Sequence, residues 1–226
     1  MEHAYSEDVC DVILVDDGST DQQTRQIIDQ LQGEGIRVIR QANRGLAAAR
    51  NRGIAAASGE FILPLDADNR IRPALITHAV RILRTDSRIG VVYGDAQYFG
   101  SKEGRWIVGP FEKARLLDWN YIDACAVFRK EVWEQNSGYD PNMPVMGMED
   151  WDFWLGAVEH GWEFAYVPEI LFDYRVSQGS MITRVYGIED VVGDYVAVKH
   201  AHLYRDTYVR LWTDYRRVTQ SIKGSG

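Results

Sequence analysis

The chain is short of the features that mark secreted, membrane-spanning or nucleic-acid-binding proteins. It has two cysteines, Cys10 and Cys125, too few for a disulfide framework. No apolar run approaches the roughly 20 residues of a membrane-spanning helix, and the N-terminal segment is polar and acidic, unlike a signal peptide. The net charge of -8 argues against a nucleic-acid partner, because basic surfaces bind phosphate backbones. We therefore expect a cytoplasmic protein.

What the sequence does contain favours a globular α/β domain. Hydrophobic residues make up 46% of its 226 residues, enough for a full core. Apolar runs predict strands at 12–15, 37–39, 61–65, 90–93 and 124–128, and helical patterns occupy 24–31, 46–57 and 73–83. Such alternation is typical of a doubly wound, mainly parallel sheet with flanking helices and right-handed crossovers.

Two adjacent carboxylates, Asp16 and Asp17, end the first apolar run in "VILVDDGSTD". Ligands of open α/β sheets bind beyond the carboxyl ends of the strands, so both side chains are candidates for a ligand site. The alternative is a local role, since aspartate is common in turns and helix caps.

A second pair of carboxylates, Asp66 and Asp68, follows the strand expected at 61–65 in "FILPLDADN". In an extended backbone, residues on either side of Ala67 point the same way. Two oxygen ligands on one side suit a hard cation such as Mg²⁺ or Mn²⁺, which would also let an acidic protein hold a phosphate-bearing ligand. Solvated acids at a strand end are the alternative. The sequence has no G-x-G-x-x-G or Walker segment, which argues against the glycine-rich routes to phosphate binding.

Two further segments carry charge beside helical patterns. In "NRGLAAARNRGI" three arginines, Arg44, Arg50 and Arg52, place cations beside the acidic segments. One of them could hold a nucleotide or a phosphate, with a solvated basic helix edge as the alternative. Glu149 and Asp150 begin the helical pattern "MEDWDFWLGAVEHGW". The helix dipole favours negative charge there, so simple capping is the alternative to a functional role.

In their order these segments resemble the family 2 glycosyltransferases of the GT-A fold. The resemblance rests on "VDDGSTD", "NRGLAAARNRGI...SGEFILPLDAD", "AVFRKEVWEQNSGYD" and "MEDWDFWLGAVEHGWEFAYVPEILFDYR", from Val12 to about Arg175. It implies transfer of a sugar, with inversion at the anomeric carbon, from a nucleoside diphosphate sugar to an acceptor hydroxyl. We expect a UDP-sugar donor and a glycan or lipid-linked glycan as acceptor.

The resemblance also implies a role for each candidate residue. The catalytic base is Asp150, and the metal ligands for Mn²⁺ or Mg²⁺ are Asp68 and Asp66. The residues expected to bind the nucleotide sugar are Asp16, Asp17, Arg50, Asp66 and Glu149.

The resemblance departs from the family pattern at the front of the chain. Family members usually have a strand and a loop ahead of the "VDDGSTD" strand, whereas only Met1 to Asp11 precede it here, so we expect the usual first strand to be lacking. A non-catalytic, front-truncated remnant that binds a nucleotide sugar or a partner is therefore the alternative function.

The end of the chain carries a second predicted unit. We divide the sequence into a GT-A domain at 1–186 and a C-terminal helical extension at 187–226. The extension has the pattern of an amphipathic helix, which suits packing on its own domain, contact with a second subunit in a homodimer, or peripheral contact with the inner face of a membrane.

Overall fold

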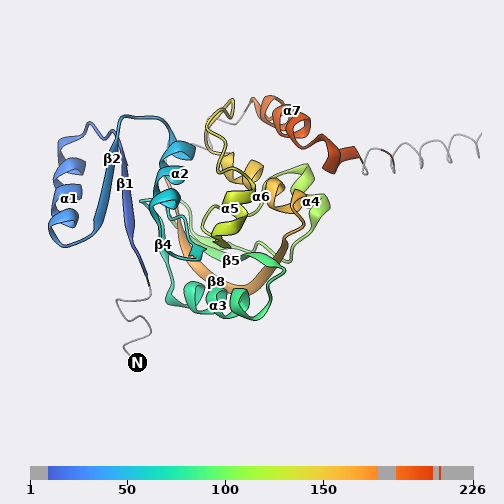
Figure 1. Ribbon diagram of the computed structural model, residues 1–226, viewed down its shortest axis with the longest axis horizontal. Helices are drawn as coiled ribbons and strands as arrows, with labels where there is room; N and C mark the ends of the chain where they lie inside the picture. The colour runs from blue at the N-terminus through green and yellow to red at the C-terminus, as the bar shows by residue number, and fades with distance from the viewer. Residues whose placement is uncertain (1–9, 178–186, 206–208, 210–226) are drawn as a thin grey trace, which may run out of the picture.

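Two sheets, one of two strands and one of six, form the framework of the protein (Figure 1). The structure is a computed structural model and describes residues 10–177, 187–205 and 209. The strands are β1 (Ile13–Asp17), β2 (Arg37–Gln41), β3 (Phe61–Ile62), β4 (Arg70–Ile71), β5 (Ile89–Gly100), β6 (Gly104–Trp106), β7 (Val127–Arg129) and β8 (Glu163–Val176). The helices are α1 (Gln22–Gly33), α2 (Leu46–Ala56), α3 (Pro73–Thr85), α4 (Lys113–Asp118), α5 (Lys130–Gln135), α6 (Glu149–Glu159) and α7 (Glu189–Lys199).

The strand pairings confirm the predicted α/β class with a mainly parallel sheet. The two longest pairings, β5 with β8 and β1 with β2, are parallel. The larger sheet has the order β3-β7-β5-β8-β4, with β6 beside β5, and its other pairings are short and antiparallel. Figure 1 shows α3 below this sheet and α4, α5 and α6 above it, so both faces are covered.

Two predicted strands are shorter than expected. The strand expected at 61–65 ends at Ile62. The strand expected at 124–128 begins only at Val127, because the N–H of Ala126 donates to the carbonyl of Ala124 at 2.7 Å. Both shortenings leave irregular backbone beside the sheet, and that backbone carries acidic side chains.

The first predicted strand is less covered than its sequence suggests. Strands of a parallel sheet are usually covered on both faces, so the apolar run at 12–15 predicts a buried strand. Val12, however, lies ahead of β1 and is 58% exposed, and Leu14 is only partly buried. Among the described residues β1 pairs with β2 alone and β3 with β7 alone, so no ladder joins the two sheets. Helix α2 connects them instead, since it packs against β1 and contributes Ile54 to the main core.

Helix α6 is buried on all sides and anchors the core. Trp151 donates its indole N–H to the carbonyl of Leu116 at 2.7 Å, and Trp154 donates to the carbonyl of Ile122 at 3.0 Å. Both indoles are almost fully buried, so their hydrogen bonds satisfy groups that water cannot reach. These bonds fix the position and rotation of the helix that begins with Glu149.

The described part of the C-terminal extension packs on this core through α7. Val192 and Val196 are fully buried. Lys199 lies 2.9 Å from Asp152 of α6, and His200 Nε2 lies 3.0 Å from the same carboxylate. Burial lowers the pKa of His200, but the hydrogen bonds with carboxylates outweigh it and the pKa is raised. The rest of the predicted amphipathic helix lies outside the described residues.

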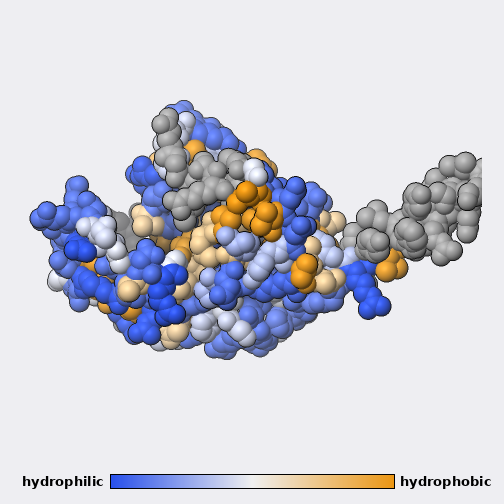
Figure 2. All heavy atoms as spheres, turned by 90° about the horizontal axis from the view of Figure 1, so that it is seen from above, coloured by the Kyte–Doolittle hydropathy of each residue, from blue (hydrophilic) through white to orange (hydrophobic). Residues whose placement is uncertain are grey.

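Helix α7 also presents apolar side chains to solvent. Val191 is 52% exposed and Val198 is 79% exposed. Figure 2 shows hydrophobic residues grouped on the upper face of the molecule, the side on which α7 lies in Figure 1. Within the described part of the chain, no helix has the length and apolarity needed to cross a membrane.

The close approach of β5 and β8 requires a glycine at position 94. A Cβ atom there would lie 2.5 Å from Leu171 Cδ1 and 2.9 Å from the carbonyl oxygen of Val167. We expect Gly94→Ala to lower the free energy of unfolding by about 1–3 kcal/mol through overpacking, measured by urea denaturation. Gly33→Ala is the control, because nothing lies within 4 Å of its added Cβ. Equal stability of the two variants would contradict this account of the β5–β8 contact.

Candidate functional site

Arg50 of α2 connects two acidic segments that are far apart in the sequence. Its Nη1 lies 2.6 Å from Glu149 Oε1 at the start of α6, and its Nη2 lies 2.8 Å from Asp66 Oδ1 beyond β3. Two predicted site segments, 61–69 and 148–162, therefore meet at one point. The structure gives Arg50 these carboxylate partners, and its predicted contact with a nucleotide stays a prediction.

The arginine and its main partner are removed from solvent. The Arg50 side chain is 9% exposed and that of Glu149 is 2% exposed. The guanidinium carbon also lies 5.4 Å from the centre of the Tyr139 ring. Burial lowers the pKa of Arg50, but the negative charge of Glu149 more than offsets this, so the arginine stays charged. The buried Tyr139 hydroxyl has no hydrogen-bond partner among the described residues.

Asp150, the predicted base, lies beside this ion pair at the start of α6. Asp150 is 8% exposed, and its Oδ1 accepts the N–H of Trp151 at 2.9 Å. Burial, reinforced by the charges of Glu149 and Asp123, raises the pKa of Asp150 well above its usual value. The N-cap position of α6 is occupied by Met148, so Asp150 is not the N-cap residue. A buried carboxyl whose pKa is raised is better suited to accept a proton.

Asp123 is a fourth acid of this group that the sequence analysis missed. It lies between α4 and β7, and its Oδ1 accepts the N–H of Cys125 at 2.8 Å. Burial and the charge of Asp66 raise its pKa to about 7. The available signal was a single carboxylate inside the apolar segment "YIDACAVF", next to a predicted strand.

The segment that carries Asp66 and Asp68 is a turn, which corrects the extended backbone assumed from the sequence. The N–H of Asn69 donates to the carbonyl of Asp66 at 3.0 Å. The side chain of Asn69 accepts the N–H of Arg175 at 2.9 Å, so the end of β8 holds the turn in place. The side chain of Asp66 is 35% exposed, and Asp68 is exposed.

These two carboxylates fit part of a divalent cation site. Both offer hard oxygen atoms that solvent can reach, as Mg²⁺ or Mn²⁺ requires. In the described part of the chain, however, no group of three or more His, Cys, Asp and Glu side chains could hold a metal ion. Asp68 and Asp66 would therefore hold the cation only with further oxygen ligands. The predicted requirement for a metal stays a prediction.

Asp16 and Asp17 make local hydrogen bonds at the end of β1. Asp16 Oδ1 accepts the N–H of Ser19 at 2.8 Å, and this bond lowers its pKa. Asp17 accepts the N–H groups of Arg44 and Gly45, each at 2.8 Å. Asp17 thus orders the loop that leads into α2, the helix of Arg50. The structure thus shows a local hydrogen-bonding role for both aspartates, which was the alternative to ligand binding. Nucleotide binding by Asp16 and Asp17 stays a prediction.

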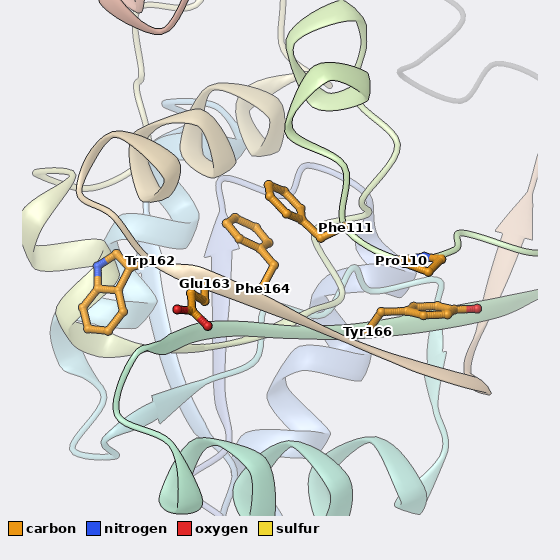
Figure 3. Close-up of a pocket in the computed structure, with 6 residues that line it drawn as sticks. All are labelled: Pro110, Phe111, Trp162, Glu163, Phe164 and Tyr166. Carbon is orange, nitrogen blue, oxygen red and sulfur yellow. The ribbon is translucent and has the colours of Figure 1, made fainter.

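A cavity elsewhere on the surface contains none of these residues. Figure 3 shows Trp162 just ahead of β8 and Phe164 and Tyr166 in the first half of that strand, with Phe111 stacked on Phe164 at a ring distance of 4.4 Å. The cavity has a volume of about 540 Å³ and is lined by Pro110, Phe111, Trp162, Glu163, Phe164 and Tyr166. Arg175, which contacts the turn of Asp66 and Asp68, lies near the other end of the same strand. The cavity is therefore separate from the acidic site.

Comparison with known proteins shows to which family the chain belongs. The family model described as "Glycosyl transferase family 2" matches residues 3–135. The chain belongs to glycosyl transferase family 2. The match includes the Asp16–Asp17 pair, Arg50, the Asp66 turn and Asp123.

Individual relatives cover different shares of the chain. An uncharacterized glycosyltransferase of Nostoc sp., alr2836, is 41% identical over 86 residues, covering 37% of this chain and 26% of that protein. The chondroitin synthase of Pasteurella multocida is 25% identical over 188 residues, covering 79% of this chain and 19% of that protein. The chain thus spans about a quarter of the first relative and about a fifth of the second.

A solved structure confirms the GT-A fold. The crystal structure of S. aureus TarS 1-349 in complex with UDP superposes with a TM-score of 0.60 at 19% identity, covering 77% of this chain and 53% of that chain. The fold predicted from the sequence is therefore confirmed.

The raised pKa of Asp123 makes the stability of the protein depend on pH. Between about pH 4 and pH 7 the folded state retains a proton that the unfolded state releases, so the free energy of unfolding falls as pH rises. We expect Asp123→Asn to remove this loss and to raise stability at pH 7 by about 1 kcal/mol or more. Thermal unfolding from pH 4 to pH 8 measures it. A variant as pH-dependent as the parent would contradict the shift.

Proposed function

We propose that the protein is an inverting glycosyltransferase that moves a sugar from a nucleoside diphosphate sugar, a UDP-sugar above all, to an acceptor hydroxyl of a glycan or lipid-linked glycan. The observation that carries the proposal is the ion-pair bridge of Arg50. It joins the segment of the predicted donor-binding acids to the helix of the predicted base. Two acidic motifs that were separate in the sequence thereby become one site.

The relatives support the same reaction class. One relative is named a chondroitin synthase, and one structural neighbour was solved in complex with UDP. The first name points to a carbohydrate product, and the second shows a uridine nucleotide bound to that neighbour. The protein spans only part of each relative, so its donor and acceptor are proposed and not transferred from them.

The proposed reaction is a single displacement at the anomeric carbon. The acceptor oxygen forms a bond to that carbon as the bond to the diphosphate oxygen breaks, and Asp150 takes the acceptor proton. Asp16 and Asp17 hold the base and ribose. A divalent cation on Asp68 and Asp66 would stabilise the negative charge of the diphosphate leaving group. The bond forms opposite the leaving group, so the configuration inverts without a covalent enzyme intermediate.

The environment of Asp150 predicts how transfer depends on pH. Only the ionised carboxylate can take a proton, and burial raises its pKa. Transfer should therefore increase as pH rises through this raised pKa, and the acidic limb should disappear in variants that lack the base.

Asp150→Asn tests the base directly. Asparagine keeps the size of the side chain and can still accept the N–H of Trp151, but it cannot take a proton. We expect transfer to fall by roughly 10²- to 10⁴-fold with little change in donor affinity. Asp190→Asn is the matched control, because Asp190 follows a glutamate in the first turn of α7 just as Asp150 does in α6.

The outcome also separates an enzyme from a non-catalytic binder. Full activity of Asp150→Asn would remove Asp150 from the reaction and leave it a helix-start residue. A parent protein that binds UDP-sugar and Mn²⁺ but transfers sugar to no acceptor would favour the alternative function, a non-catalytic protein that binds a nucleotide sugar. Donor affinity and transfer are therefore measured on the same samples.

Asp68→Ala tests the metal. Asp68 is exposed and lies outside the Arg50 bridge, so its removal should leave the fold intact. We expect Mn²⁺ to strengthen UDP binding to the parent protein and to have almost no effect on UDP binding to Asp68→Ala, measured by calorimetry. Asp190→Ala removes an exposed carboxylate elsewhere and serves as the control. Undiminished enhancement by Mn²⁺ would exclude Asp68 as a ligand.

A further inference from the structure

The two carboxylate partners of Arg50 differ in how easily they can be replaced. Glu149 is 2% exposed, and its Oε2 also accepts the N–H of Gly147 at 2.7 Å. The Tyr139 ring lies near the guanidinium as well, with 5.4 Å from its centre to the guanidinium carbon. The side chain of Asp66, in contrast, is 35% exposed. A ligand arriving from solvent can therefore displace Asp66 from Arg50 while Glu149 keeps its hold.

Asp66 has two uses that oppose each other. In this structure its Oδ1 accepts a hydrogen bond from Nη2 of Arg50 at 2.8 Å. As a cation ligand the same carboxylate would hold Mn²⁺ or Mg²⁺ beside the guanidinium, which repels the cation because both are positive. Arg50 and the divalent cation therefore compete for Asp66.

In the absence of a nucleotide, a bound cation has few other ligands to offset the repulsion by Arg50. Hard divalent cations take about six oxygen ligands, and the described residues hold no group of three candidate ligating side chains. A diphosphate supplies oxygen ligands for the cation. It also offers Nη2 of Arg50 an anionic partner in place of Asp66. Arginine binds phosphate oxygens through charge-assisted hydrogen bonds, so Arg50 would exchange one anion for another.

We propose that Arg50 occupies Asp66 until a nucleoside diphosphate arrives, so that cation binding and diphosphate binding are coupled through this one side chain. The inference rests on the proposed function, which supplies the diphosphate and the cation. By linkage, the factor by which UDP strengthens cation binding equals the factor by which the cation strengthens UDP binding. Arg50 is thus a positioning residue that makes the cation site conditional.

The test compares Mn²⁺ affinity by calorimetry in the parent protein and in Arg50→Gln, each with and without UDP. In the parent, Mn²⁺ alone should bind weakly and UDP should tighten it by about tenfold or more, within the usual range of coupling. In Arg50→Gln, Mn²⁺ alone should bind about tenfold more tightly, and the gain from UDP should shrink. Arg52→Gln removes the same charge from an exposed position of α2 and should leave both values unchanged.

A second variant guards against loss of the fold. Arg50→Gln leaves the buried Glu149 without its counter-charge, which destabilises a protein strongly. In the double variant Arg50→Gln/Glu149→Gln, position 149 carries a neutral amide and no longer a buried, unpaired charge. Asp66 has still lost its ion pair with Arg50. Glu149→Gln alone keeps Arg50 on Asp66 and is the control for the double variant. Thermal unfolding without ligands identifies which variants are folded.

Each outcome decides the inference. Folded Arg50 variants that bind Mn²⁺ alone no more tightly than the parent overturn it, and so does a parent that binds Mn²⁺ equally well with and without UDP. Absence of Mn²⁺ binding while UDP binds overturns the metal in the proposed function together with the inference, but not the role of Asp150. If UDP fails to bind, the proposed donor is wrong, and the effect of Arg50→Gln on Mn²⁺ alone still decides the competition.

Discussion

The buried ion pair between Arg50 and Glu149 is the constraint on which the site depends. Both side chains are almost fully buried. Arg50 belongs to α2 and Glu149 to α6, and the two residues are 99 positions apart in the sequence. A buried pair is costly to break because either partner left alone is an uncompensated charge. The rest of the structure holds both ends in place. Asp17 orders the loop that enters α2, and the indole hydrogen bonds of Trp151 and Trp154 fix α6.

The ionisation of the carboxyl groups in the site depends on the same ion pair. Four carboxyl groups, Asp66, Asp123, Glu149 and Asp150, influence one another around a single arginine. Burial raises the pKa of Asp123 and that of Asp150, and the neighbouring carboxylates raise them further, because one positive charge stabilises the ionised form of only part of this group. A site with this imbalance favours ligands that bring positive charge with them. A diphosphate accompanied by a divalent cation has this property, whereas a bare phosphate does not.

The sequence predicted the positions of the acids better than their contacts. Asp66, Glu149 and Asp150 could be found because each lies at a strand end or helix start, and local patterns mark such places. That Arg50 would join them depends on the packing of α2 against the core, which no local pattern encodes. Asp123 was missed for the same reason, since a single carboxylate in an apolar segment gains meaning only from its neighbours in space. The turn after Asp66 was missed because its apolar flanks resemble a strand.

Helix α7 extends the constraint beyond the site. Asp152, in the first turn of α6 with Glu149 and Asp150, binds Lys199 and His200 rather than a ligand. The start of α6 is therefore held from two sides, by Arg50 of α2 and by the C-terminal end of α7. These contacts restrain the helix start, and the proton acceptor proposed there needs a fixed geometry relative to its substrate. The described part of the C-terminal extension thus contributes to positioning Asp150, although it supplies none of the acids of the site.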